Sequence, residues 1–178
     1  QPMDRFLDYA LWLSVRAQGD VWLKALLDGK FQLVGREGAL DFALANLPAE
    51  KGLKGIRNLI PKPMPSDGSG PWLGLAIKTA DPDMLAAIFA QLLDGGFDAP
   101  AAATVMKGLE GVVSQRQVKL KGDSMKLLGL FNSTAPETAA AALRLAGALK
   151  VEGLLEPIKG FASNSSASPI LRLAATDA

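Results

Sequence analysis

The chain has 178 residues, of which 49% are hydrophobic and 21% charged, and its formal net charge is +1. So balanced a charge gives no general attraction to nucleic acid or anionic lipid. Cysteine and histidine are absent, which excludes disulfides, zinc sites of the Cys/His kind, c-type haem attachment and histidine base catalysis. We therefore expect no cofactor and no metal, and the lack of long apolar runs predicts no membrane insertion.

The first part of the chain predicts paired helices. Residues 3–17 carry apolar side chains almost all round the helix, as expected for a helix packed between neighbours. Asp20 is predicted to cap a second helix that stops at Gly29. A further pair is predicted over residues 36–47 and 51–60.

Prolines and capping residues predict the helices that follow. One helix is expected in "GPWLGLAIKTA", and the next has Asp81 as its cap and Pro82 in its first turn. That helix is expected to end at Gly95, and Pro100 then opens the helix "AAATVMKGLEGVVSQRQ".

The last third predicts four more helical segments. A short helix is expected over residues 123–131, and Thr134 is predicted to cap "TAPETAAAALRLAGAL" with Pro136 in its first turn. The segments "VEGLLEPIKGFAS" and "SPILRLAATDA" complete the series.

An apolar residue followed three positions later by a small one recurs along the chain. The spacings between successive copies are 33, 33, 32, 38 and 28 residues. The copies are Leu7–Ala10, Leu40–Ala43, Leu73–Ala76, Val105–Gly108, Leu143–Ala146 and Leu171–Ala174. A period near 33 residues indicates a repeat architecture, because one helix pair cannot bury its own apolar face.

The small residues of the motif have a packing role. Helices at 8–10 Å need small side chains where their backbones approach most closely, and we expect Ala10, Ala43, Ala76 and Ala146 at those points. The predicted fold class is all-α, an α-solenoid of about five or six stacked helical hairpins over residues 1–178. Residues 61–71 are expected to form a Pro/Gly-rich loop within it.

Two stretches resemble known helical-repeat proteins. The alternation "LRLAGALKVEGLLEPI" followed by "SPILRLAA" is similar to HEAT-type repeats of the armadillo-like kind. The opening "PMDRFLDYALWLSVR", "VWLKALLDGKFQLVG" and "LDFAL" resembles the helical-repeat segment of large exported planctomycete and verrucomicrobial proteins.

In those proteins the segment lies between a dehydrogenase-like β-propeller and a c-type haem domain. The resemblance implies that this chain is a fragment of an extracytoplasmic, periplasmic and redox-associated parent protein. The chain itself lacks a Cys-x-x-Cys-His motif, so the haem would not be bound here.

Several polar clusters have both a functional and a structural interpretation. Asp4 and Asp8 share a helix face, where they either perform acid–base or metal chemistry or simply favour the helix start beside Arg5. The loop 61–71 is either a protruding contact loop or a stretched connection between repeats. A second basic cluster comprises Arg116, Lys119, Lys121 and Lys126.

The possible contact surface combines a basic stripe at helical spacing with neighbouring residues. Its members are Lys51, Lys54, Arg57, Lys62 and Trp72. Charged helix faces are usually only solvated, and the three tryptophans in apolar runs favour packing over a binding site.

These observations favour a non-catalytic scaffold whose partner is a protein or a neighbouring domain of the same chain. No catalytic, cofactor-binding or metal-binding residue is predicted. The alternative is a nucleic-acid-binding HEAT-like enzyme such as a DNA glycosylase, which needs a basic concave face that a net charge of +1 does not suggest. A chromophore lyase on a HEAT-like scaffold is a third and weaker interpretation.

Overall fold

The computed structural model describes residues 5–28, 30, 39, 42, 43, 46, 62–69, 72–79 and 81–178. The regular structure of these residues is helical and they contain no strand, which confirms the all-α class. The chain divides into two compact units. The first comprises Gln1–Lys62 with Gly70–Thr79, and the second comprises Pro63–Ser69 with Ala80–Ala178.

Three helices of the first unit are described: α1 (Arg5–Ala17), α2 (Gly19–Leu27) and α5 (Trp72–Thr79). The prediction that Asp20 caps α2 is wrong, because the helix begins at Gly19 with Gln18 as its N-cap. The amides of Val21 and Trp22 donate to the Gln18 carbonyl at 3.0 and 3.1 Å, so Asp20 lies in the first turn. A carboxylate is favourable there, near the positive end of the helix.

Several described apolar side chains of α1 are exposed, whereas its composition predicts a helix packed between neighbours. Phe6 is 84% exposed and Tyr9 60% exposed, and Ala10 is also exposed. Tyr9 stacks on Trp12 with ring centroids 5.7 Å apart, and the Arg16 guanidinium lies 4.7 Å from the Trp12 ring centroid. Tyr9, Trp12 and Arg16 thus form a stack along α1 itself, and a pattern of apolar residues does not distinguish such stacking from burial.

The second unit contains the longer series of helices. In chain order they are α6 (Pro82–Leu93), α7 (Ala99–Arg116), the 3₁₀ helix η1 (Ser124–Leu130), α8 (Pro136–Ala148), the 3₁₀ helix η2 (Glu152–Leu154), α9 (Leu155–Ser163) and α10 (Pro169–Asp177). The predicted short helix at 123–131 is the 3₁₀ helix η1, capped by the Asp123 side chain, which accepts from the Met125 amide at 3.1 Å. None of the described helices is long and apolar enough to cross a bilayer.

The capping signals predict the limits of α6 correctly but fail for α8, as they do for α2. Asp81 caps α6 as predicted, and its carboxylate accepts from the amides of Asp83 and Met84 at 3.2 and 3.1 Å. Gly95 adopts a φ of 74° just after the helix, which is the left-handed conformation that favours glycine. Thr134 is not the cap of α8, because Ala135 occupies that position and Pro136 opens the helix directly.

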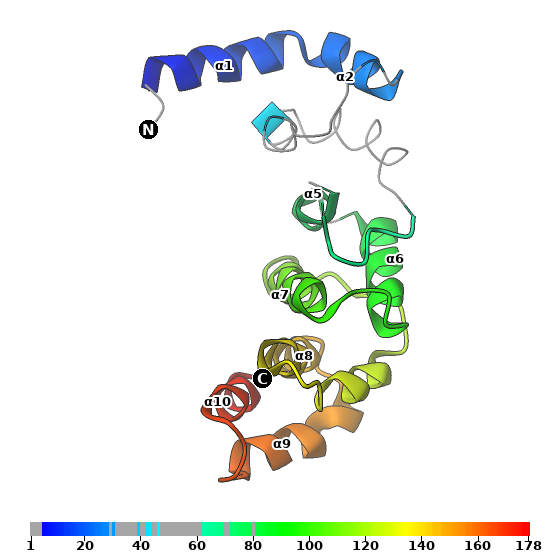
Figure 1. Cartoon of the computed structure of the whole chain (residues 1–178), viewed down its shortest axis with the longest axis vertical. Helices are drawn as coiled ribbons and strands as arrows, with labels where there is room; N and C mark the ends of the chain where they lie inside the picture. Colours follow the sequence, from blue (N-terminus) through cyan, green and yellow to red (C-terminus); the bar gives the residue numbers. More distant parts are fainter. Residues whose placement is uncertain are drawn as a thin grey trace. The chain divides into compact units, whose positions relative to one another are not determined.

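Three helices of the second unit form a row of parallel neighbours. Helix α7 packs against α8, and α8 packs against α10 (Figure 1). The Thr138 hydroxyl near the start of α8 donates to the Ala99 carbonyl at the start of α7 at 2.8 Å. At the other end of α8, Gly147 lies against the backbone of Ala178 just after α10. The N-terminal ends of α7 and α8 therefore lie side by side, as do the C-terminal ends of α8 and α10, so the three helices run parallel.

A second row supports the first. Helix α6 packs against α7, η1 against α8, and α9 against α10. The members of the second row also contact one another along the chain. Helix η1 contacts α6, and it contacts α9 through the short helix η2, which packs against both. In each of the three pairs the second-row element precedes its first-row partner in the chain.

The recurring small residues lie at the packed faces of these helices. Ala76, Ala146 and Ala174 are each 0% exposed. Gly108 is half-buried on α7, and Ala43 is half-buried. The expectation is wrong for Ala10, which is exposed on α1. The motif therefore predicts a fully buried small residue on α5, α8 and α10 correctly and fails on α1.

Residues 63–69 form a strap on the second unit. Gln91 of α6 accepts from the Met64 amide at 2.9 Å and donates to the Met64 carbonyl at 2.8 Å and the Gly96 carbonyl at 3.1 Å. The Asp98 amide donates to the Ser66 carbonyl at 2.8 Å, and the Met64 side chain is buried. Hydrogen bonds to its backbone thus hold the described part of the predicted loop on the second unit. This favours the interpretation as a connection between repeats and counts against a protruding contact loop.

Candidate functional site

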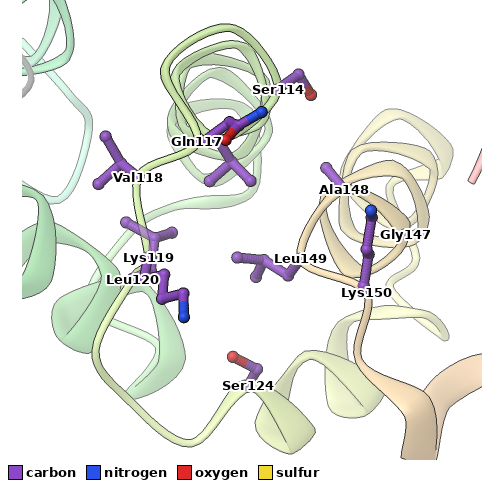
Figure 2. A pocket seen from close by; sticks show the side chains of 11 residues that line it. Ser114, Gln117, Val118, Lys119, Leu120, Ser124, Gly147, Ala148, Leu149 and Lys150 are labelled. Carbon is purple, nitrogen blue, oxygen red and sulfur yellow. The ribbon is translucent and has the colours of Figure 1, made fainter.

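A groove of about 710 Å³ opens where α7 and α8 end (Figure 2). One wall is the last turn of α7 with residues 117–120, and the opposite wall is residues 147–150 at the end of α8. Ser124 closes one side, and Leu149 points from the α8 wall into the space between them (Figure 2). Because the two helices are parallel, their C-terminal ends meet at this groove.

The connection that forms one wall is anchored where it meets η1. Gly122 has a φ of 149°, and a Cβ added to it would lie 3.2 Å from the Phe89 ring of α6. Phe89 is fully buried, so the chain runs closely over the core at this point. Asp123 then fixes the start of η1 through its hydrogen bond to the Met125 amide. This end of the wall is therefore fixed against the core and the start of η1.

Two residues in the groove have an unusual backbone conformation. Gln117 has a φ of 51° and Lys150 a φ of 53°, and they are the two non-glycine residues with positive φ in the described part of the chain. Each follows a helix end: the Gln117 amide donates to the Val113 carbonyl at 3.0 Å, and the Lys150 amide donates to the Gly147 carbonyl at 2.9 Å. Glycine is the usual residue at such positions, so the chain accepts a backbone cost at both.

The backbone cost at Lys150 can be measured by comparing two substitutions. We expect Lys150→Gly to unfold with a free energy about 1 kcal/mol higher than Lys150→Ala, because only glycine adopts the left-handed conformation without steric strain. Both variants lose the same charge, so the difference isolates the backbone. Urea unfolding would show a higher midpoint with an unchanged slope for the glycine variant. Equal midpoints would contradict a left-handed Lys150.

The charges in the groove are unbalanced. Lys119 and Lys150 come from opposite walls, and the lining residues include no aspartate or glutamate (Figure 2). Each helix C-terminus contributes roughly −0.5 of an elementary charge, so the two ends offset about one of the two lysines. The groove therefore keeps a net positive charge, next to apolar side chains from Val118, Leu120 and Leu149.

The predicted contact surface is described only in part. Lys51, Lys54 and Arg57 lie outside the described residues. Lys62 is exposed, and Trp72 is half-buried in α5 of the first unit. The contact surface therefore stays a prediction.

The second basic cluster is divided by its surroundings. Lys126 forms an ion pair with Asp94 at 2.8 Å, and this hydrogen bond raises the pKa of Lys126 above its ordinary value. Lys121 is exposed outside the groove, whereas Lys119 lines it. One member of the cluster thus lies in the groove, and another is already paired with a carboxylate.

The structure does not test the paired carboxylates Asp4 and Asp8. Asp4 and the side chain of Asp8 lie outside the described structure. Where residues are described, no group of three or more aspartate, glutamate, histidine or cysteine side chains could hold a metal ion.

Sequence reasoning missed the two left-handed residues of the groove. Neither Gln117 nor Lys150 carries a local signal, since a helix end of this kind is recognised in sequence by glycine or asparagine. Lys119 was found only as part of a charge cluster.

No family model, curated protein or solved structure matches this chain.

Proposed function

We propose that this chain is a non-catalytic helical-repeat scaffold that makes contacts with a protein or with neighbouring domains of the same chain. The observation that supports it best is the row of parallel helices α7, α8 and α10. Sequential helices of an up-and-down bundle are antiparallel neighbours. Parallel neighbours result when every first-row helix is followed by a return element, as in stacked repeats.

The finer proposal is an α-solenoid of the HEAT type. Three pairs in the second unit follow one another in chain order: α6 with α7, η1 with α8, and α9 with α10. The first-row member of each pair carries one copy of the apolar-to-small motif. Stacks of this kind offer extended surfaces that suit macromolecular partners, and they need no reactive side chain.

The parent protein is a further part of the proposal. By the resemblance of its opening residues, the segment belongs to an exported redox-associated protein and acts outside the cytoplasm. The test is the reading frame on both sides of the coding segment. A β-propeller sequence upstream and a Cys-x-x-Cys-His motif downstream would support this parent, and a frame without either would contradict it.

Behaviour on heparin distinguishes the scaffold from a nucleic-acid-binding enzyme. We expect the chain to elute from heparin at or below roughly 0.15 M salt, because its net charge is only +1. The measurement is the elution position in a salt gradient, with a strongly basic protein as the control. Retention well above that salt concentration would favour the nucleic-acid alternative and count against the scaffold.

A further inference from the structure

We propose that the groove at the ends of α7 and α8 binds an extended acidic segment of a partner protein, with a carboxylate between Lys119 and Lys150 and an apolar side chain against Leu149. This inference rests on the proposed scaffold function and specifies where and what the scaffold binds. The groove lies wholly within the second unit.

Charge complementarity determines the chemistry of the partner. The lining holds two lysines and no carboxylate. Two helix C-termini, at roughly −0.5 of a charge each, offset only about half of this positive charge. One lysine would therefore be enough to neutralise the partial negative charges of the two helix ends, and the charge of the second lysine remains. An anionic group would complement the remaining charge.

The apolar lining distinguishes a protein segment from a free anion. Leu149 points into the groove, and Leu120 comes from the opposite wall (Figure 2). An inorganic ion would leave these side chains in contact with water. A peptide that alternates acidic and apolar residues covers both kinds of surface, because successive side chains of an extended chain point to opposite sides.

The backbone at the groove gives an independent argument. The two described non-glycine residues with positive φ, Gln117 and Lys150, both line it. Glycine would relieve the backbone at either position but would remove a long polar side chain from the groove. Two unfavourable backbone conformations in the same groove indicate that the side chains of Gln117 and Lys150 have a role there.

The test is binding of a fluorescein-labelled peptide of alternating glutamate and leucine to the full chain, followed by fluorescence anisotropy. We expect saturable binding that weakens about 2- to 5-fold for Lys119→Gln and for Lys150→Gln, as for exposed ion pairs. Glutamine is a suitable replacement at position 150, because Gln117 already adopts the same backbone conformation. Raising the salt concentration should weaken binding as well.

Lys121→Gln is the matched control variant. Lys121 is exposed, lies two positions from Lys119 in the same connection and does not line the groove. It should leave the affinity unchanged. An equal loss for all three variants would indicate general charge attraction and overturn the inference.

Three matched probes separate the alternatives. Replacing glutamate by glutamine or leucine by serine should each reduce binding, and a labelled single-stranded oligonucleotide should not compete. Competition by the oligonucleotide would assign the groove to nucleic acid and contradict a protein segment. Absence of peptide binding would overturn the groove inference alone, since the heparin and reading-frame tests judge the scaffold without it.

Discussion

Replacing Ala146 with leucine is expected to lower the free energy of unfolding by about 1–3 kcal/mol, because the added methylenes have no space in a packed helix interface. Ala146 is 0% exposed in α8, which lies between α7 and α10. The same replacement at Ala10 is the matched control, since Ala10 holds the equivalent motif position but is exposed on α1. That variant should change the free energy of unfolding by less than about 0.5 kcal/mol.

Urea unfolding of the two variants measures this difference, and hydrogen exchange shows where the damage lies. In a stack of repeats the amides of α8 and α10 should exchange faster in Ala146→Leu, while those of α6 keep most of their protection. Equal destabilisation by both leucines would mean that Ala10 is as closely packed as Ala146. Uniform loss of protection would count against stacked repeats.

Replacing Gln91 with alanine is expected to cost about 2–3 kcal/mol. Its side chain makes three hydrogen bonds to backbone groups, two with Met64 and one with Gly96. Each is worth about 1 kcal/mol, and the truncated variant leaves partly buried backbone groups without partners. The free energy of unfolding and the exchange rate of the Met64 amide should both report the loss.

Two further variants make this test specific. Gln91→Glu keeps an acceptor for the Met64 amide but places a carboxylate against two carbonyls, so it should not restore stability. Gln115→Ala changes an exposed glutamine on α7 and should have little effect. If Gln91→Ala unfolded like the unmodified protein, the strap would not be held as described.

Much of the second unit could be predicted from local sequence signals. Asp81, Pro82 and Gly95 gave the limits of α6 because capping and left-handed conformations depend on a few neighbouring residues. The motif at Leu143–Ala146 predicted a packed helix correctly, because a small side chain allows the close helix approach found at Ala146. Thr134 misled because proline can open a helix without a side-chain cap before it.

The first unit shows the limit of such reasoning. An apolar helix such as α1 has the same pattern whether a neighbour covers it or its aromatic side chains stack along its own surface. Only tertiary contacts distinguish these cases. The stretch that carries Lys51, Lys54 and Arg57 lies outside the described residues, so the structure offers no comparison for that part of the prediction.

The groove could not be predicted, for a different reason. It depends on two helix ends meeting, which requires the parallel order of α7 and α8, and on left-handed residues that are not glycine. A sequence pattern reports the length of each helix but not which ends converge. Lys119 and Lys150 are separated by 31 positions, and neither is distinguished from the other surface lysines by its neighbours.

The strap has a practical consequence for dividing the chain. A Pro/Gly/Ser-rich stretch such as residues 61–71 is the usual place to cut a protein into domains or to insert a tag. Here a truncation that began at Trp72 or Pro82 would remove Met64 and Ser66, which hydrogen-bond with Gln91 and Asp98. A fragment meant to retain the second unit intact should therefore begin before Pro63.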